Sequence, residues 1–493
     1  MKCFLLLLLA FWLPANALFA QFHLLNEIPA KASFLAADQA KRLDPPVLNG
    51  TLAETLDQVF DSLTALSPVK GFNAAMLLPD GSYWKRASGL AEAAPLSVPL
   101  STEHLMGMGS ITKSFVATTV LLLTEDGLLD LDDSIGQHLD PYPNVPGNVT
   151  IRQLLSHRSG INDYLNENEA TVDAWLGHLD SIWTPDVILN NFVLEPNFPV
   201  NEDWSYSNTN YLLAARIIEN VTGQPWYQVV RQRLLEPLDL THTFAFPWET
   251  PGDQPFSHVW ADFDGNGTVE DVQGLGLPAE GLFSLASGAG CLLSTPEDLV
   301  RFSERLYGGH VLQPATLAEM QTDYVQDPTL GYSYGLGTTS FSMPQNLENW
   351  GHNGDLLYKS VALYFPTENM SLAVQQNDDR LSDPDGVIDL YEIYFYLLIT
   401  YLNYSPVSAT YEAGRGTNAL KVYPNPAHQS VRLQFKADAH PDFPVRCVLT
   451  DANGRVVLSQ TLNSTAEKIS IGQLPVGVYG LRADGYSGWV VRM

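Results

Sequence analysis

Residues 108–123 read Met-Gly-Ser-Ile-Thr-Lys-Ser-Phe-Val-Ala-Thr-Thr-Val-Leu-Leu-Leu, and this stretch decides what the chain can be. The apolar run stops near Gly127, which predicts a helix that Ser110 opens. Residues three apart share one helix face, so the Ser110 hydroxyl and the Lys113 ammonium can meet in one pocket. A lysine whose pKa is lowered by burial can take the proton of a serine and make it a nucleophile. Alone, the pattern also fits a helix-capping serine followed by a solvated lysine.

Two later segments give the pair its context. Residues 204–211 read Trp-Ser-Tyr-Ser-Asn-Thr-Asn-Tyr, and residues 350–355 read Trp-Gly-His-Asn-Gly-Asp. The order Ser-x-x-Lys, Tyr-x-Asn, His-x-Gly resembles the penicillin-recognising superfamily of class C β-lactamases and D-alanyl-D-alanine carboxypeptidases, which are serine hydrolases. Residues 129–135 and 154–160 also resemble this family, and the resemblance covers about residues 55–400. It implies a β-lactamase/transpeptidase-like fold.

The resemblance implies a role for each catalytic residue. Ser110 attacks a carbonyl carbon and forms an acyl-enzyme, while Lys113 and Tyr206 share the proton transfers. Asn208 orients Lys113 and a substrate amide. Tyr206 can act as a phenolate only if cationic neighbours lower its pKa far below about 10. The alternative for Tyr206 is an ordinary, partly buried tyrosine.

The third motif implies the substrate-binding residues. The backbone N–H groups of Ser110 and Asp355 form the oxyanion hole of the family, and Gly354 lets the substrate approach the strand edge. His352 stands where many β-lactamases and carboxypeptidases have lysine, and histidine holds a carboxylate less firmly because it is only partly charged near neutral pH. His352 could alternatively be a surface loop residue. We expect His157 to be structural, bonded to a turn beside Ser159 and Gly160.

The predicted function is therefore a secreted serine hydrolase that cleaves an ester or a D-amino-acid peptide or amide bond. No cofactor is required for an acyl-enzyme on serine. Two alternatives stay open: a true β-lactamase, which His352 disfavours, and a catalytically silent binding protein or adhesin on the same fold.

One loop resembles a calcium site. Oxygen-bearing side chains alternate at Asp262, Asp264, Asn266 and Thr268, with a glycine at the sixth position, as in an EF-hand loop. The twelfth position is Gln273 instead of the usual glutamate. The loop is thus either a structural calcium site or a polar turn.

The order of elements predicts an α+β domain. A helical pattern over 51–66 precedes two strand-like runs, 71–78 and 83–90, joined by a turn. Helices and loops fill 101–314, strand-like runs return at 332–336, 360–365 and 371–375, and a helix spans about 390–402. We expect an antiparallel sheet completed by both ends of the domain, flanked by helices and accompanied by a helical subdomain.

The remaining segments predict export. Residues 1–20 carry one lysine before an apolar run too short to span a bilayer, which predicts a secretory signal, and residues 21–50 follow as a leader. The hydrolase domain is expected at 51–403 and a linker at 404–419.

The segment 420–493 has short alternating runs that predict a small all-β sandwich. Three segments, 422–426, 451–455 and 474–479, resemble the C-terminal sorting domain of the type IX secretion system, which implies passage through the periplasm and outer membrane to the medium or the cell surface. A carbohydrate-binding or adhesive sandwich is the alternative.

Composition restricts the partners. The 493 residues include 26 Lys and Arg against 55 Asp and Glu, a net charge of −29. This negative charge disfavours binding to nucleic acid or to an anionic membrane surface. After removal of the signal only Cys291 and Cys447 remain, in different predicted domains, so no disulfide framework is expected.

Overall fold

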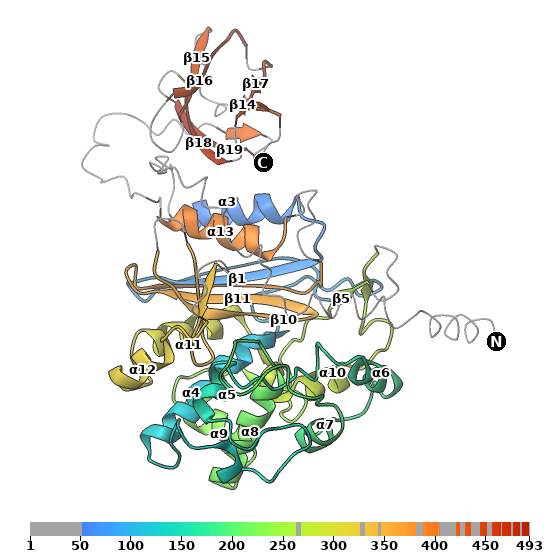
Figure 1. The fold of residues 1–493 in the computed structure, drawn as a ribbon. Helices are drawn as coiled ribbons and strands as arrows, with labels where there is room; N and C mark the ends of the chain where they lie inside the picture. Colours follow the sequence, from blue (N-terminus) through green and yellow to red (C-terminus); the bar gives the residue numbers. More distant parts are fainter. Residues whose placement is uncertain are drawn as a thin grey trace, which may run out of the picture. The chain divides into compact units, whose positions relative to one another are not determined.

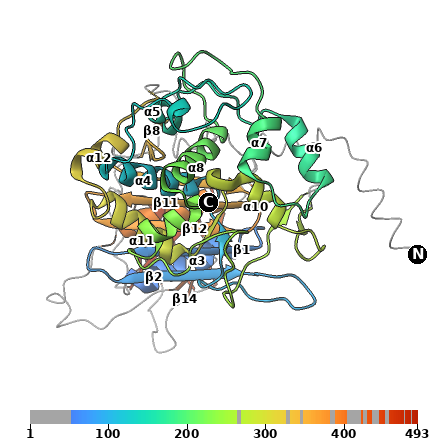
Figure 2. The same ribbon diagram turned by 90° about the horizontal axis from the view of Figure 1, so that it is seen from below.

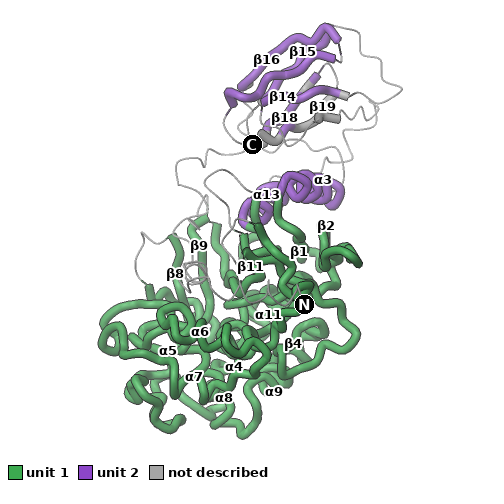
Figure 3. The backbone as a smooth tube through the Cα atoms, turned by 90° about the vertical axis from the view of Figure 1, so that its right-hand side faces the viewer, with its two compact units in different colours: residues 1–34, 68–390 green, residues 35–67, 391–493 purple. Residues whose placement is uncertain are grey.

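The computed structural model describes residues 52–262, 268–325, 331–343, 347–380, 388–402, 404, 421–423, 429–434, 444–450, 456–464, 466–474, 477–483 and 486–492. The chain divides into two compact units, one within residues 68–390 and the other joining residues 35–67 to 391–493 (Figure 3). The signal and leader predicted over 1–50 lie outside the described residues. The predicted domain boundaries and the linker stay predictions.

Within the described ranges, seven strands of the first unit form one antiparallel sheet (Figure 1). Their order across the sheet is β2 (Tyr83–Gly89), β1 (Gly71–Leu77), β12 (Met370–Gln376), β11 (Tyr358–Phe365), β10 (Trp350–Leu356), β9 (Thr339–Phe341) and β8 (Tyr332–Tyr334). β1 pairs with β12, with Ala75 opposite Ala373. Strands from both ends of the domain sequence therefore meet inside the sheet, which confirms the predicted α+β fold.

The helices of this unit follow the first hairpin in sequence. They are α4 (Thr112–Glu125), α5 (Ile151–Leu155), α6 (Glu169–Gly177), α7 (Pro185–Asn191), α8 (Thr209–Thr222), α9 (Trp226–Val230), α10 (Glu280–Ala286), α11 (Pro296–Tyr307) and α12 (Pro314–Met320). α11 contacts β1, β11 and β12, and α4 lies beside α8 (Figure 2). The helical subdomain thus lies on the face of the sheet that α11 covers (Figure 1).

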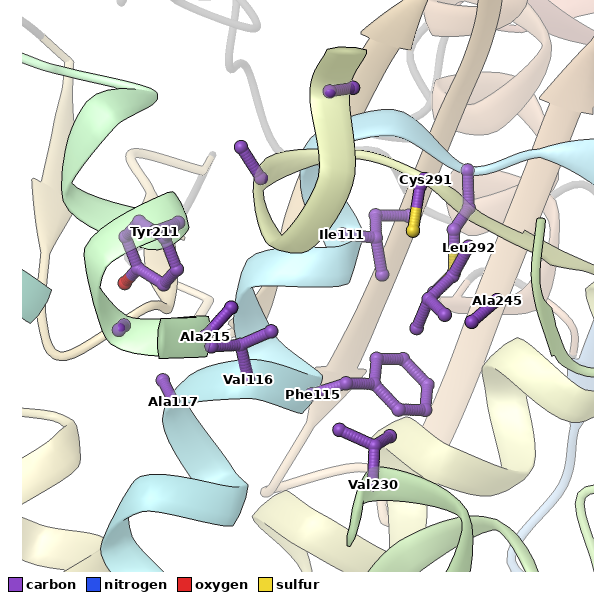
Figure 4. Packing of buried hydrophobic residues seen from close by; sticks show 14 of the residues in the cluster. Ile111, Phe115, Val116, Ala117, Tyr211, Ala215, Val230, Ala245, Cys291 and Leu292 are labelled. Carbon is purple, nitrogen blue, oxygen red and sulfur yellow. The ribbon is translucent and has the colours of Figure 1, made fainter. Parts of the chain in front are cut away.

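Helix α4 runs through the middle of the core. Its Phe115 side chain lies among the buried apolar residues drawn in Figure 4, and the Phe115 ring stacks on Phe302 of α11 with centroids 3.6 Å apart. Thr118 and Thr119 are buried too, and each hydroxyl donates to the carbonyl four residues earlier. A helix buried on all sides keeps its two ends fixed in place, which matters because the predicted nucleophile stands at its start.

The second unit contains two helices and a set of strands. Helices α3 (Leu52–Thr64) and α13 (Leu390–Leu402) lie side by side (Figures 1 and 3). One sheet has the order β13 (Lys421–Tyr423), β14 (Ser430–Gln434), β17 (Ile469–Ser470), and the other β16 (Val456–Leu462), β15 (Val445–Thr450), β18 (Gly477–Ala483), β19 (Tyr486–Arg492). Alternate residues of β15, Val445, Cys447 and Leu449, are buried in one core. The predicted all-β module is confirmed.

No helix within the described ranges has the length and apolarity needed to cross a membrane.

The stacked pair predicts a large stability effect. Replacing Phe302→Ala removes the partner of Phe115 and leaves a cavity, so the free energy of unfolding should fall by about 3–5 kcal/mol. Urea denaturation of the protein, followed by near-UV circular dichroism, measures this change. Leu128→Ala, at a side chain that is 52% exposed, is the control and should change it by less than about 0.5 kcal/mol. Equal effects of the two substitutions would contradict the packing described for α4.

Candidate active site

Two glycines bring the start of α4 against the sheet. The chain passes from β3 (Met106–Gly107) into a short 3-10 turn, η1 (Gly109–Ile111), that carries Ser110. Gly109 has φ +49°, and a Cβ there would lie 2.6 Å from the backbone nitrogen of Asp355. A Cβ on Gly354 would lie 1.9 Å from the carbonyl oxygen of Met108. Only glycine permits this approach, and it brings Ser110 next to the end of β10.

The Lys113 amine is fully buried and has three neighbours. Lys113 Nζ lies 2.9 Å from Ser110 Oγ, 2.8 Å from Asn208 Oδ1 and 2.7 Å from the carbonyl oxygen of Ala289. Burial lowers the pKa of Lys113 to about 7, and the charge of Asp163 opposes this shift. The amine and the ammonium forms of Lys113 are therefore both accessible near neutral pH.

The amide of Asn208 is oriented by a buried carboxylate. Asn208 precedes α8, and its Nδ2 donates to Asp163 Oδ2 at 2.9 Å. Because a carboxylate accepts hydrogen bonds, this contact directs Asn208 Oδ1 to Lys113. Asp163 also accepts from the backbone N–H of Leu165 and from Asn166 Nδ2, at 3.0 and 2.6 Å. Burial raises the pKa of Asp163, while the hydrogen bonds from Leu165 and Asn208 and the charge of Lys113 lower it.

The Tyr206 ring lies beside the same amine. Its centroid is 4.8 Å from Lys113 Nζ. The hydroxyl is buried and interacts with the side chain of Ser110. Burial raises the pKa of Tyr206 well above its usual value, and the nearby Tyr334 adds to this, whereas the interaction with Ser110 lowers it. The environment therefore favours the neutral phenol over the phenolate.

A chain of hydrogen bonds links His157 to His352 through Tyr334 of β8. The backbone N–H of Ser207 donates to His157 Nδ1 at 3.1 Å, and His157 Nε2 lies 3.1 Å from the Tyr334 hydroxyl. That hydroxyl lies 3.1 Å from His352 Nε2, and His352 Nδ1 lies 2.5 Å from the carbonyl oxygen of Asn353. Burial lowers the pKa of His352 to about 3, so the ring is neutral at physiological pH. These bonds also differ from the turn contact expected for His157.

The side chain of Asp355 does not face Ser110. Neighbouring residues of a strand point to opposite faces, and the Cα of Gly354 faces Met108. The Asp355 carboxylate instead accepts a hydrogen bond from Lys359 Nζ at 2.7 Å. The carboxylate of Asp355 is thus engaged by Lys359, and the oxyanion role of its backbone N–H stays a prediction.

The structure brings together most of the predicted site residues. Ser110, Lys113 and Asn208 meet at one amine, Tyr206 lies against it, and Gly354 and Asp355 lie against the nucleophile turn. His352 lies two residues before Gly354 on β10 and is buried.

The predicted calcium loop is elsewhere in the unit. Asp262 and Thr268 lie between β5 (Trp260–Ala261) and β6 (Glu270–Asp271), while Asp264 and Asn266 lie outside the described residues. The calcium site stays a prediction.

Sequence reasoning missed Asp163, Tyr334 and the Ala289 carbonyl. Asp163 follows Ser159-Gly160 in an otherwise uncharged stretch, 161–165, and a single acid among uncharged residues was the available signal. Tyr334 stands in a predicted strand, where a tyrosine is ordinary. The contact made by the Ala289 carbonyl cannot be recognised from the sequence, because every residue has a backbone carbonyl.

Comparisons with known families agree with this geometry. The model of the family described as Beta-lactamase matches residues 56–392, and that of the secretion system C-terminal sorting domain matches residues 421–492. The second match implies type IX secretion and attachment at the cell surface, as the sequence predicted.

Individual relatives are hydrolases and penicillin-binding proteins. The chain is similar to penicillin-binding protein 4* of Bacillus subtilis (28% identity, covering 57% of this chain and 63% of that one). It is also similar to esterase EstB of Burkholderia gladioli (31% identity, covering 41% of this chain and 54% of that one). The chain thus spans about half to two thirds of the length of these curated relatives.

Among solved structures, a D-stereospecific amidohydrolase from Streptomyces sp. is 30% identical, with a TM-score of 0.58 over 68% of this chain and 97% of that one. Since the family match covers more than half of the chain, and the motifs of that family meet at one buried amine, the protein belongs to the beta-lactamase family of serine hydrolases and carries a C-terminal sorting domain for secretion.

Proposed function

We propose that this exported hydrolase forms an acyl-enzyme on Ser110 and cleaves an ester bond or the amide bond of a D-amino acid. The proposal rests on one observation, the arrangement of three groups around the amine of Lys113.

A neutral amine has two N–H groups and one lone pair. Two of the neighbours of Lys113, the Ala289 carbonyl and Asn208 Oδ1, can only accept hydrogen bonds, so they take both N–H groups. The lone pair then points at the remaining neighbour, Ser110 Oγ, which lies 2.9 Å away. The amine is therefore oriented to accept the proton of Ser110 as its oxygen attacks a carbonyl carbon.

The rest of the reaction uses the neighbouring groups. The backbone N–H groups of Ser110 and Asp355 would stabilise the oxyanion, a type of donor whose loss costs about 2.7–4 kcal/mol of transition-state stabilisation in other enzymes. The ammonium of Lys113 would return its proton to the leaving group, either directly or through the phenol of Tyr206, which Lys113 then reprotonates; in both cases the neutral amine is restored. Water then attacks the acyl carbon while Lys113 takes its proton, and the bond to Ser110 Oγ breaks as Lys113 gives that proton to Ser110.

The substrate class is supported by two facts. A neutral His352 does not supply the cation that would hold a substrate carboxylate. Similar proteins are described as an esterase and a D-stereospecific amidohydrolase. The neutral His352 favours esters and D-amino-acid amides over penicillins, although the relatives also include a penicillin-binding protein.

Covalent labelling tests the nucleophile. A fluorophosphonate probe should label the native protein and fail to label Ser110→Ala, because the labelled atom is Ser110 Oγ. The same substitution should lower kcat/KM on a p-nitrophenyl ester by at least about 10³-fold. Ser303→Ala, which removes a buried hydroxyl from α11, is the control and should be labelled normally. Labelling that survives Ser110→Ala would refute the proposal, and added labelling by a fluorescent penicillin would favour the β-lactamase alternative.

The buried carboxylate predicts a change in pH dependence. Lys113 acts as a base when unprotonated, so kcat/KM should rise with pH through about 7. Anionic Asp163 favours the ammonium form of Lys113, so Asp163→Asn lowers the pKa of Lys113. The rise of kcat/KM with pH should then move to lower pH by about one unit.

The pH profile of ester hydrolysis measures this shift. Asp239→Asn removes the same charge from a side chain that is 80% exposed and should leave the profile unchanged. A rise that moves to higher pH in Asp163→Asn, or does not move, would contradict the coupling of Asp163 to Lys113.

A further inference from the structure

The hydrogen-bonded chain through Tyr334 has a defined direction. A backbone N–H can only donate, so the contact with Ser207 leaves His157 Nδ1 unprotonated and puts the ring proton on Nε2. A carbonyl can only accept, so the contact with Asn353 puts the proton of His352 on Nδ1. Tyr334 therefore accepts from His157 and donates its own proton to His352 Nε2. The two histidines are neutral and hold opposite tautomers.

The backbone of His157 supports a specific role for its ring. His157 has φ +60°, a conformation that costs a non-glycine residue energy unless its surroundings hold it there. The residue is completely buried, and its ring lies 4.3 Å, centroid to centroid, from the ring of Tyr206. The strained backbone thus places an imidazole between Tyr206 and Tyr334.

The chain connects the two sides of the active site. It begins at Ser207, between Tyr206 and Asn208, and it ends at Asn353, two residues before Asp355. The Ser207 end lies beside Tyr206 and Asn208, which belong to the proton-transfer groups. The Asn353 end lies beside Asp355, whose backbone N–H is a proposed oxyanion donor. Tyr334 lies between them and touches neither Ser110 nor Lys113 by any hydrogen bond of the described chain.

Both nitrogens of His352 are occupied by protein partners. Its Nδ1 donates to the main chain and its Nε2 accepts from Tyr334, so no N–H is left for a ligand. The titratable groups that face His352 and Tyr334 are Lys113, His157, Tyr206, Tyr211, Tyr307 and Tyr332. The charge of Lys113 also opposes protonation of His352.

We propose that Tyr334 is a positioning and specificity-determining residue, which braces β10 against the Tyr206–Asn208 loop and holds His352 in the tautomer that offers no N–H to a ligand, so that the site accepts substrates without a carboxylate beside the scissile bond. This inference rests on the proposed function. Tyr334 acts through His352 and does not contact the reacting atoms.

A pair of substrates that differ in one group tests the proposal. N-acetyl-D-alanyl-D-alanine amide and the free acid share the bond between the two alanines, whose cleavage is followed as release of N-acetyl-D-alanine. We expect native kcat/KM to favour the amide by at least about tenfold, with a ratio that is constant from pH 5.5 to 8. In Tyr334→Phe, His352 stays buried but loses the donor that excludes its Nε2–H tautomer, so this N–H becomes available to a substrate carboxylate. The ratio should then fall at least about threefold across this pH range, and kcat for the amide should fall.

The control is Tyr364→Phe, which removes a hydroxyl that donates to Asn369 on another part of the sheet. It should keep the native ratio and kcat. A native ratio near one, or a Tyr334→Phe enzyme that matches the native one in ratio and kcat at every pH, would overturn the inference. In either case Ser110-dependent phosphonate labelling would still support the proposed hydrolase, so the two failures are distinguishable.

A measurement on the native protein does not depend on the folding of a variant or on turnover. Long-range ¹H–¹⁵N spectra of protein labelled in histidine should show His157 as the Nε2–H tautomer and His352 as the Nδ1–H tautomer, both unchanged from pH 5.5 to 8. His157→Asn, which tolerates the left-handed backbone, and His352→Gln assign the signals. Titration of either ring in this range, or identical tautomers, would overturn the inference.

Discussion

The burial of one lysine amine controls the rest of the site. A buried ammonium with too few partners is costly, and a buried free amine needs acceptors for its two N–H groups. Lys113 finds its partners 95 and 176 residues away in sequence, at Asn208 and Ala289. Helix α8 and the turn before β7 (Leu292–Ser294) must therefore pack against α4 for the amine to be satisfied. The packing of α8 and of this turn against α4 is what brings both partners to the amine.

A second constraint joins the helical region to the sheet. The backbone at Gly109 touches that of Asp355, and the backbone at Gly354 touches that of Met108. The Ser360 hydroxyl donates to the same Met108 carbonyl at 2.8 Å and fixes the contact. A side chain at either glycine would separate the nucleophile turn from β10. Such a separation would also move apart the two N–H groups that we assign to the oxyanion, and electrostatic stabilisation of that kind depends on donors held at hydrogen-bonding distance.

The sequence predicted the features that depend on local motifs and spacing, and it missed those that depend on contacts between residues far apart in the chain. The spacing of Ser110 and Lys113, followed in order by Tyr206, Asn208 and His352, predicted which residues converge, and alternating runs predicted the sheet. Asp163 could not be assigned because its partner Asn208 is 45 residues away. Tyr334 could not be assigned because its role depends on a contact 177 residues distant. A phenolate at Tyr206 was left open by the sequence, and burial in the folded protein disfavours it.

The charges around Lys113 explain why a neutral His352 suits a base that must also act as an acid. A cation at His352 would lower the pKa of Lys113 further, and the resulting ammonium would be too rarely populated at neutral pH to be regenerated easily in each cycle. A general acid–base works best when its pKa is close to the working pH. Asp163 supplies one negative charge on the side of Asn208, and burial keeps His352 on the opposite side uncharged. The pKa of Lys113 can then stay near 7, where the same nitrogen takes the proton of Ser110 and gives it back.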